Sequence, residues 1–206
     1  MALPEIIIRS ERTLWGFADH PRCKGFTLIE LMVTLTVAAI LLTVGIPGFQ
    51  EFIKSNSLST GVNAFVAGLN LARSEAIKRG GRVTLCKSST LSACATSGGW
   101  EQGWIIFFDQ GVAGTVDSGD AIVRTNGLAS GDITLRGNFF VKDRVSYLSS
   151  GIVEPNNGTV IACDHRIKNF ATDKAKARAI IISKVGRVRT VKGDNSTVSV
   201  TSCTPS

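Results

Sequence analysis

The chain has 206 residues, which is enough for one membrane-spanning helix and a single globular domain. It carries 23 Lys and Arg against 16 Asp and Glu, so its formal net charge is +7. Only two histidines are present, His20 and His165, and this scarcity argues against acid–base catalysis and against an enzyme.

The first feature along the chain is a short basic leader followed by an apolar segment. The leader covers residues 1–25, and residues 26–46 then carry a single charged side chain, Glu30. At about 1.5 Å per residue this segment forms a helix roughly 31 Å long, which matches the hydrocarbon core of a bilayer. A carboxylate inside such a helix costs about 2.5–3.5 kcal/mol, so Glu30 needs a partner and a role.

The junction between leader and helix reads Gly25-Phe26-Thr27-Leu28-Ile29-Glu30-Leu31. It resembles the processing site of type IV pilins and type II secretion pseudopilins. This resemblance implies a prepilin peptidase and methyltransferase that cuts after Gly25 on the cytoplasmic side and methylates the new amine of Phe26. It also implies that Glu30 meets the Phe26 amine of a neighbouring subunit in a filament. Alternatively, Glu30 serves only as a determinant for the peptidase or the methylase.

A second segment, further along the chain, indicates one group within these filament subunits. It reads Leu69-Asn70-Leu71-Ala72-Arg73-Ser74-Glu75-Ala76-Ile77-Lys78-Arg79-Gly80 and is similar to the GspH/FimT group of minor subunits. The resemblance covers most of the chain after the leader, and it implies a type IV pilin-like fold. It further implies that the partners are other major and minor pilins or pseudopilins.

Two other interpretations explain the apolar segment less well. A secretory signal ends in a small-residue cleavage site after its apolar run, whereas here the helical pattern continues through residues 46–50. A plain membrane anchor gives no reason for Glu30. Because Arg22 and Lys24 precede the segment, we expect a cytoplasmic N-terminus, with the chain after Ile46 on the other side of the membrane. The resemblance to pilins implies that this single pass crosses the inner membrane and that the C-terminal domain is periplasmic.

The helical pattern continues over residues 47–80 as an amphipathic, periplasmic half of the same helix. One apolar stripe recurs at spacings of three and four, and it consists of Leu58, Val62, Phe65, Leu69, Ala72 and Ala76. Pro47, between Gly45 and Gly48, predicts a kink or local melting. Gly80-Gly81 predicts the end of a helix that begins at Phe26.

Residues 81–206 predict a β-rich globular domain, because the apolar period changes from helical spacing to two. The expected strands are Arg82–Lys87, Gly103–Asp109, Ala121–Arg124, Asp132–Arg136, Arg144–Leu148, Thr159–Cys163, Arg178–Ser183 and Arg187–Lys192. Trp104–Phe108 is apolar on both faces, which predicts a central strand covered on each side. Asn157-Gly158 predicts a two-residue hairpin. The fold class is therefore α+β, a long N-terminal helix packed on antiparallel β-sheets.

Four cysteines remain once Cys23 leaves with the leader, and an even number in an exported domain predicts disulfides. Three connectivities are open. We favour Cys86–Cys94 as a local clasp and Cys163–Cys203 as a bond that holds the C-terminal tail. A zinc site is the alternative, but the paired C-x-x-C spacing is missing.

Two groups of residues are weak candidates for a catalytic thiol and for a calcium site. Cys163-Asp164-His165 contains a thiol near a base, but we expect Cys163 to be oxidised in a disulfide, which leaves no thiol to act as a nucleophile. Asp109, Asp117 and Asp120 lie in a glycine-rich loop, but their spacing does not match a calcium loop. We therefore expect no catalytic residues, cofactor or metal.

Positive charge is concentrated near the C-terminus. Residues 165–192 contain nine Lys and Arg and one Asp, a charge of +8. The chain after the leader has 19 Lys and Arg against 13 Asp and Glu, a charge of +6, so the rest of it carries −2. Such a segment favours an acidic partner.

Within this segment, Arg187 and Arg189 fall on one face of a strand, roughly 6.5–7 Å apart, with Val188 facing the core. Two guanidiniums at this spacing suit successive phosphates. Gly186-Arg187-Val188-Arg189 resembles the Gly-Arg-x-Arg element of FimT-type minor pilins, which that resemblance links to DNA capture in natural transformation. The candidate residues for binding double-stranded DNA are Gly186, Arg187, Arg189, Lys184, Lys192 and Arg178.

Two alternatives to DNA remain open. In the first alternative, the arginines only keep an edge strand of the sheet soluble. In the second, they pair with acidic residues of neighbouring subunits at a filament tip. The chain would then be an H-type pseudopilin of a type II secretion system that contacts exoproteins or tip subunits. We expect Trp100 and Trp104 to pack in the core rather than to stack on bases.

Overall fold

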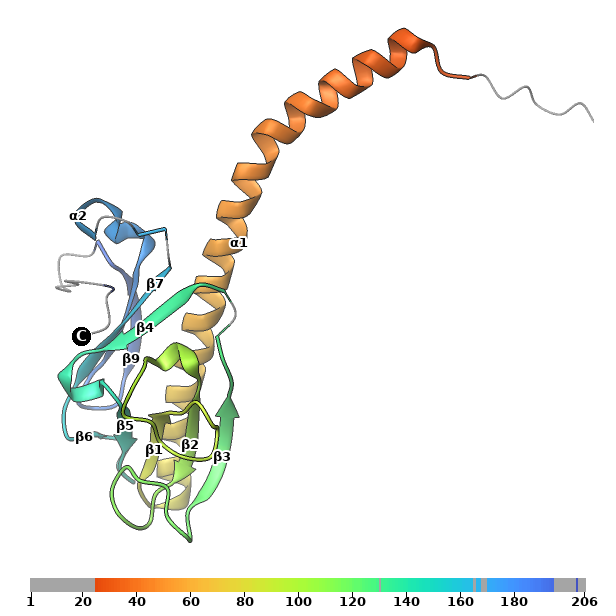
Figure 1. Cartoon of the computed structure of the whole chain (residues 1–206). Coiled ribbons are helices and arrows are strands. Elements are labelled where there is room, and N and C mark those ends of the chain that lie inside the picture. Colours follow the sequence, from red (N-terminus) through yellow and green to blue (C-terminus); the bar gives the residue numbers. More distant parts are fainter. Residues whose placement is uncertain (1–24, 130, 165, 168–169, 195–202, 204–206) are drawn as a thin grey trace, which may run out of the picture. The chain divides into compact units, whose positions relative to one another are not determined.

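A computed structural model of the chain describes residues 25–129, 131–164, 166–167, 170–194 and 203. In this part of the chain a long helix, α1 (Leu28–Arg79), precedes two antiparallel sheets (Figure 1). The strands are β1 (Val83–Lys87), β2 (Trp104–Phe108), β3 (Ala121–Asn126), β4 (Ile133–Gly137), β5 (Arg144–Tyr147), β6 (Val153–Glu154), β7 (Gly158–Asp164), β8 (Arg178–Ile182) and β9 (Val188–Lys192). The short helices are η1 (Trp100–Gln102), η2 (Phe139–Val141), α2 (Phe170–Asp173) and η3 (Lys174–Lys176). This architecture confirms the expected α+β class.

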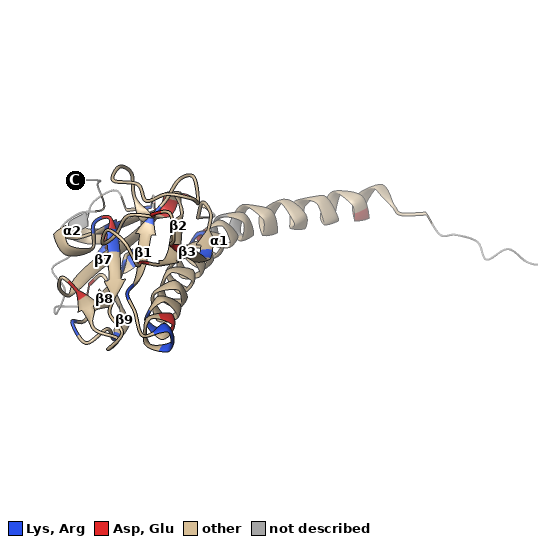
Figure 2. Ribbon diagram, turned by 90° about the horizontal axis from the view of Figure 1, so that it is seen from below, with Lys and Arg blue, Asp and Glu red and all other residues tan. Residues whose placement is uncertain are grey.

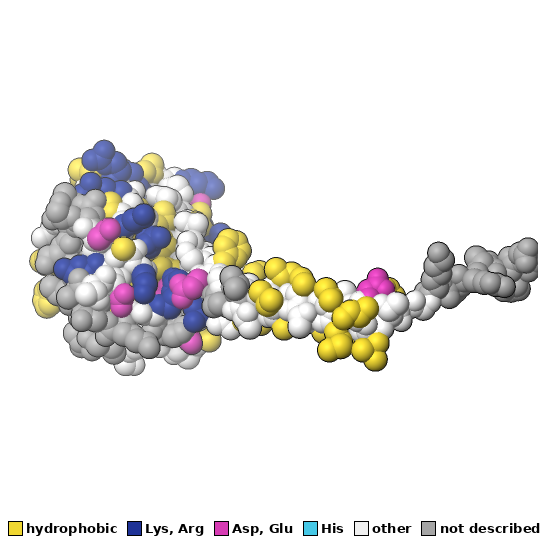
Figure 3. All heavy atoms as spheres, turned by 90° about the horizontal axis from the view of Figure 1, so that it is seen from above, with side chains coloured by type: hydrophobic (Ala, Val, Ile, Leu, Met, Phe, Trp, Pro, Cys, Tyr) yellow, Lys and Arg dark blue, Asp and Glu magenta, His cyan; other side chains and the backbone are white. Residues whose placement is uncertain are grey.

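The chain divides into two compact units, Met1–Gly45 and Ile46–Ser206. Within the first unit, many exposed hydrophobic side chains lie along the described part of α1 (Figure 3). By length and composition, α1 contains a segment apolar enough to cross a membrane. Helical structure runs without a break through Pro47, so local melting, one of the two alternatives expected there, was wrong, and the kink stays a prediction. Proline removes only one hydrogen bond of the ladder, and the flanking residues keep their helical conformation.

The second half of α1 presents the predicted apolar stripe to the core. All six residues of that stripe are buried, which confirms the spacing argument. Two glycines let the sheets approach closely, since a Cβ at Gly68 would lie 2.6 Å from the Trp104 ring and one at Gly61 would lie 2.4 Å from Ile133. The helix ends at Gly80, which has a φ of +65°.

The sheets divide the β-rich part into two layers beside this half of α1. Sheet A has the order β3-β2-β1-β5-β6 and sheet B the order β4-β7-β8-β9. Both contribute to one hydrophobic core around the helix, through Leu85 and Ile106 from sheet A and Val160 and Ile180 from sheet B. Figure 2 shows sheet B with β7, β8 and β9 side by side.

Strand β2 lies between β1 and β3 and is covered on both faces, as its apolar sequence predicts. Trp104 and Ile106 join the core around α1, whereas Ile105 and Phe107 form a smaller cluster with Cys86. The loop after β1 covers that second cluster. A disulfide between Cys86 and Cys94 closes this loop, which is the connectivity the sequence favours.

The hairpin expected at Asn157-Gly158 was wrong. Here the chain passes from β6 in sheet A to β7 in sheet B, so the two flanking strands do not pair with each other. Neither residue has the positive φ that a type I′ turn requires. Gly158 instead allows close packing, because a Cβ there would lie 2.4 Å from the Val141 side chain. The two-residue strand β6 was missed because it is too short to show a period of two.

The second disulfide joins Cys163 of β7 to Cys203. Its sequence separation is 40, and it ties Cys203 to sheet B. This is again the connectivity that the sequence favours. Register places Cys163 opposite Thr134 of β4, on the face of the sheet that points away from α1.

Candidate nucleic-acid interface

The turn between β8 and β9 carries the two arginines of interest and is closed by its own hydrogen bonds. The Gly186 amide donates to the Ser183 carbonyl at 2.8 Å, and the Ser183 amide donates to the Arg187 carbonyl at 2.9 Å. The Arg187 amide donates to Ser183 Oγ at 3.1 Å. These three hydrogen bonds connect the end of β8 to the start of β9.

Gly186 has a structural reason to be glycine. Its φ is +79°, and a Cβ there would lie 2.0 Å from the Gly151 carbonyl oxygen of the neighbouring turn in sheet A. A side chain would therefore be strained by the backbone and would also collide with a carbonyl. The glycine allows the turn of sheet B to lie directly against sheet A.

Arg73 of α1 fixes both turns, although the sequence analysis assigned it no role. Its Nη2 donates to the Val185 carbonyl at 2.9 Å, and its Nε donates to the Gly151 carbonyl at 3.2 Å. The only available signal was the position of Arg73 beside the buried stripe of the helix, next to Ala72. From sequence alone that position looks like an ordinary solvated face.

Arg187 and Arg189 are exposed, and the pairing of Arg189 with Ile181 places both on the face of sheet B away from α1. Val188 packs against the core, as expected. Neither arginine side chain forms an ion pair with any residue that the structure describes. They border a groove of about 670 Å³, the basic groove, which is lined by Asn157, Ile181, Ile182, Ser183, Lys184, Arg187 and Arg189.

The structure does not bring all the candidate residues together. Lys184 lies at the basic groove, where its Nζ donates to the Pro155 carbonyl. Arg178 and Lys192 pair with each other at the opposite end of the β8–β9 hairpin. Strand alternation places both on the opposite face from Arg189. The set of candidate residues that lie close in sequence is therefore larger than the group of cations that the structure brings together at the basic groove.

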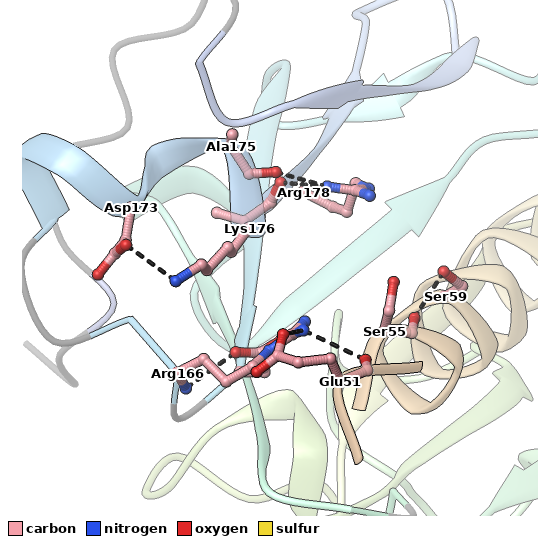
Figure 4. Close-up of polar contacts among 10 residues, drawn as sticks. Glu51, Ser55, Ser59, Arg166, Asp173, Ala175, Lys176 and Arg178 are labelled. Atoms are coloured by element: carbon pink, nitrogen blue, oxygen red, sulfur yellow. Dashed lines mark hydrogen bonds and ion pairs between the residues drawn. The ribbon is translucent and has the colours of Figure 1, made fainter. Parts of the chain in front are cut away.

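Much of the remaining positive charge is paired within the molecule (Figure 4). Arg166 forms ion pairs with Asp164 and with Glu51 of α1, and the hydrogen bond to Asp164 raises its pKa further. Lys176 pairs with Asp173. Arg178 donates to the carbonyls of its own turn. His165 and Lys168 of this segment lie outside the described residues.

Three features of the sequence have structural roles. Asp109 accepts hydrogen bonds from Thr84 Oγ1 at 2.6 Å and from Arg82 at 3.0 Å, and the latter bond raises the Arg82 pKa. The neighbouring loop carboxylates accept from backbone amides. Trp100 and Trp104 are buried, which confirms that they pack in the core. Among the described residues no cluster of His, Cys, Asp and Glu is arranged to hold a metal.

At the N-terminal motif, Gly25 and Phe26 are exposed and precede the first turn of α1. The Glu30 amide donates to Thr27 Oγ1 at 3.2 Å, so Thr27 caps the helix. Thr27-Leu28-Ile29-Glu30 also has the spacing of a capping box, a signal that the sequence analysis missed. A carboxylate in the first turn is further favoured by the helix dipole.

A long apolar N-terminal helix, whose second half packs on two antiparallel sheets, defines the type IV pilin-like class of filament subunits. The protein-family model described as Type II transport protein GspH matches residues 61–186, which is more than half of the chain. The model for the prokaryotic N-terminal methylation motif matches residues 20–46. The chain therefore belongs to the GspH family, as its sequence resemblance implies.

Parts of the chain are also similar to individual curated proteins. Prepilin peptidase-dependent protein D of Escherichia coli (strain K12) is 38% identical over 58 residues, which are 28% of this chain and 40% of that protein. Type IV major alpha-pilin of Moraxella bovis is 36% identical over 69 residues, 34% of this chain and 43% of that protein. The matches thus span less than half the length of these curated relatives.

A solved structure supports the fold. The type IV minor pilin FimU of Pseudomonas aeruginosa (strain PAO1) superposes with a TM-score of 0.55 and 21% identity. The similarity covers 74% of this chain and 99% of that one. At this level of identity the likeness concerns the fold alone.

Proposed function

We propose that the protein is a non-enzymatic minor subunit of a type IV filament machine. In this proposal a prepilin peptidase removes residues 1–25 and methylates the amine of Phe26. Residues 26–46 anchor the subunit in the inner membrane, residues 47–80 continue the helix into the periplasm, and residues 81–206 form the periplasmic domain. The methylation motif, the apolar helix and membership of the GspH family support this assignment.

We further propose that the basic groove binds double-stranded DNA for uptake in natural transformation. The observation that carries this proposal is the pair of exposed guanidiniums of Arg187 and Arg189 on one face of the β8–β9 hairpin, neither of which forms an ion pair with a described residue. Lys184 adds a third cation at the same groove. A guanidinium binds phosphate with two parallel hydrogen bonds, so successive phosphates of one strand fit this arrangement.

Contacts of this kind read the phosphate backbone and not the base sequence. The expected dissociation constant is about 10⁻⁴–10⁻⁶ M at physiological salt, and binding weakens steeply as salt rises. The chain is positively charged overall, which speeds the encounter with DNA.

The first prediction concerns Arg187→Ala combined with Arg189→Ala, measured in the full chain reconstituted into nanodiscs of zwitterionic lipid. We expect the dissociation constant for a labelled duplex to rise at least about tenfold, because two phosphate contacts are lost. The slope of log K against log salt should also fall by about 1.8. Fluorescence anisotropy at several salt concentrations measures both quantities.

Lys174→Ala combined with Lys192→Ala is the matched control, because it removes the same charge from exposed positions at the other end of the hairpin. It should weaken binding less than the arginine variant does. Equal weakening by both variants would mean that net charge, and not a site, drives binding. Wild-type affinity in the arginine variant would rule out the proposed contact.

A second candidate function is that of an H-type pseudopilin in a type II secretion system, acting through tip subunits or exoproteins. The description of the matching family as a type II transport protein favours it. Deleting the gene separates the two functions. Loss of exoproteins from the medium supports secretion, whereas loss of transformants with normal secretion supports DNA uptake.

A further inference from the structure

Two adjacent phenylalanines of η2 lie on the surface of the second unit. The side chain of Phe139 is 88% exposed and that of Phe140 is 42% exposed. Their ring centroids are 5.5 Å apart, with the planes inclined at 82°. Exposed aromatic pairs are uncommon on a soluble surface and indicate contact with a ligand or partner.

Strand register places η2 at the same end of sheet B as the basic groove. Gly137 at the end of β4 pairs with Val160 of β7, Gly158 at the start of β7 pairs with Ile182 of β8, and Ile182 pairs with Val188 of β9. The segment that follows β4 and the turn that precedes β9 therefore emerge from the same end of the sheet (Figure 1). Three strand spacings separate them, about 14 Å.

The surface around the two rings is basic. A second groove of about 340 Å³ is lined by Phe139, Phe140, Lys142, Asp143, Arg144 and Pro155. Lys142 and Arg144 are exposed. The acidic member, Asp143, is paired at 2.5 Å with the buried ammonium of Lys87, which offsets its charge. The net character of this aromatic groove is therefore positive.

The aromatic groove and the basic groove adjoin. Pro155 lines the former, and its carbonyl accepts a hydrogen bond from Lys184, which lines the latter. Asn157, two residues further on, also lines the basic groove. A chain bound at one groove can thus continue to the other without leaving the protein surface.

We propose that Phe139 and Phe140 form a stacking platform for unpaired bases of single-stranded DNA, whose phosphates continue to Arg187 and Arg189. The proposal rests on the proposed function of the basic groove and extends it to a second form of the ligand. Base stacking on aromatic side chains beside a cationic track is the general mode of sequence-independent single-strand binding. A duplex keeps its bases stacked inside, so only the phosphate contacts are available to it.

Charge favours nucleic acid over a protein partner at this patch. Each ring lies within a groove that has two exposed cations and no acidic group free of a partner among the described lining residues. Phosphates need those cations, whereas an apolar protein contact does not.

The test uses the full chain in zwitterionic nanodiscs and labelled 20-nucleotide DNA, single-stranded or duplex, at one salt concentration. Phe139→Ser should weaken single-strand binding at least about fivefold and leave duplex binding within twofold. Phe139→Trp keeps a stacking surface and should retain single-strand affinity. Leu128→Ser is the matched control, since that side chain is 79% exposed on the β3–β4 loop, and it should change neither affinity.

The outcomes separate this proposal from the proposed function. Arg187→Ala with Arg189→Ala should weaken both DNA forms, and if it weakens neither, the basic groove is not a DNA site. In that case a single-strand defect of Phe139→Ser supports base stacking at η2 but overturns the continuation of the strand to Arg187 and Arg189. Unchanged single-strand binding by Phe139→Ser overturns the platform, as does an equal loss on both DNA forms. If Phe139→Ser leaves DNA binding unchanged but abolishes filament incorporation, the platform is overturned and the rings contact a protein partner instead.

Discussion

Gly186 and Arg73 are the two residues on which the geometry of the basic groove depends. The glycine permits a positive φ and an approach to the Gly151 carbonyl that no other residue allows. The arginine donates to both turns that meet there. Arg187 is therefore presented by a turn held from two sides, which reduces the conformational entropy lost when a phosphate binds.

Gly186→Ala should lower the free energy of unfolding by at least about 1–2 kcal/mol, the cost of a left-handed conformation for a residue with a Cβ. The overlap with the Gly151 carbonyl adds to that cost. We expect a midpoint of thermal unfolding roughly 2–8 °C lower, measured by tryptophan fluorescence in detergent. Duplex affinity should fall as well, because the turn that carries Arg187 is displaced.

Gly119→Ala is the control for this substitution, because its φ is not positive and a Cβ there meets nothing within 4 Å. It should leave the unfolding midpoint within about 1 °C. If both substitutions had the same small effect, the close approach at Gly186 would not contribute to stability.

Helix α1 changes character along its length. Its first part exposes large apolar side chains all round, and its second part buries one stripe against both sheets. Near its C-terminus, Glu75 forms ion pairs with Arg79 at 2.7 Å and with Lys78 at 3.8 Å. The hydrogen bond from Arg79 is the main cause that lowers the Glu75 pKa, with smaller contributions from Lys78, and desolvation opposes them.

A lowered pKa in the folded state means that the unfolded chain takes up a proton first as the pH falls. The Glu75 pairs therefore stabilise the fold above an unfolded pKa of about 4.3, and this contribution disappears as the pH falls through the lowered folded pKa. Glu75→Gln should unfold at a lower temperature than wild type at pH 7. At about pH 2.5 the two midpoints should converge.

Salt is the internal control for this comparison, because about 1 M NaCl screens exposed pairs and should shrink the difference at pH 7. A difference of the same size at both pH values would mean that the carboxylate charge of Glu75 does not contribute. The substitution would then act through packing alone.

The molecule as a whole combines an apolar N-terminal segment with a β-rich part that carries the candidate grooves. The apolar N-terminal segment suits burial in a membrane or in a filament core, because its large apolar side chains are exposed within the described chain. Its one carboxylate is Glu30. Besides serving as a determinant for the peptidase or the methylase, Glu30 can meet the Phe26 amine of a neighbouring subunit, or it can complete the capping box that begins at Thr27.

Two variants separate these roles. Glu30→Ala removes both the charge and the box, whereas Glu30→Gln keeps a side chain that suits the box and removes only the charge. If Glu30 pairs with an amine, both variants should lose filament incorporation while leader removal continues. Immunoblots of sheared filaments and of membrane fractions measure the two steps. Normal incorporation of Glu30→Gln would contradict pairing and leave capping, or recognition by the peptidase or the methylase, as the role.

Local signals were sufficient for much of the fold. The buried stripe of α1, its end at Gly80 and most strands follow from periodicity and glycine placement, because each depends on neighbouring residues along the chain. The passage of the chain from one sheet to the other near Asn157 could not be predicted from local signals. A hairpin signal describes the turn itself and carries no information about which strands the chain joins afterwards.

The N-terminal motif, the apolar helix and the cationic strand can be read directly from residue order, since each is a pattern within a few turns or one strand. The surfaces these residues form depend on long-range pairing. Strand register separated Lys192 from Arg189, and it placed Phe139 at the same end of sheet B as Arg187. Side chains distant in sequence share a surface only because of hydrogen bonds between strands and packing on α1. Neither of these interactions can be predicted from the local composition of the chain.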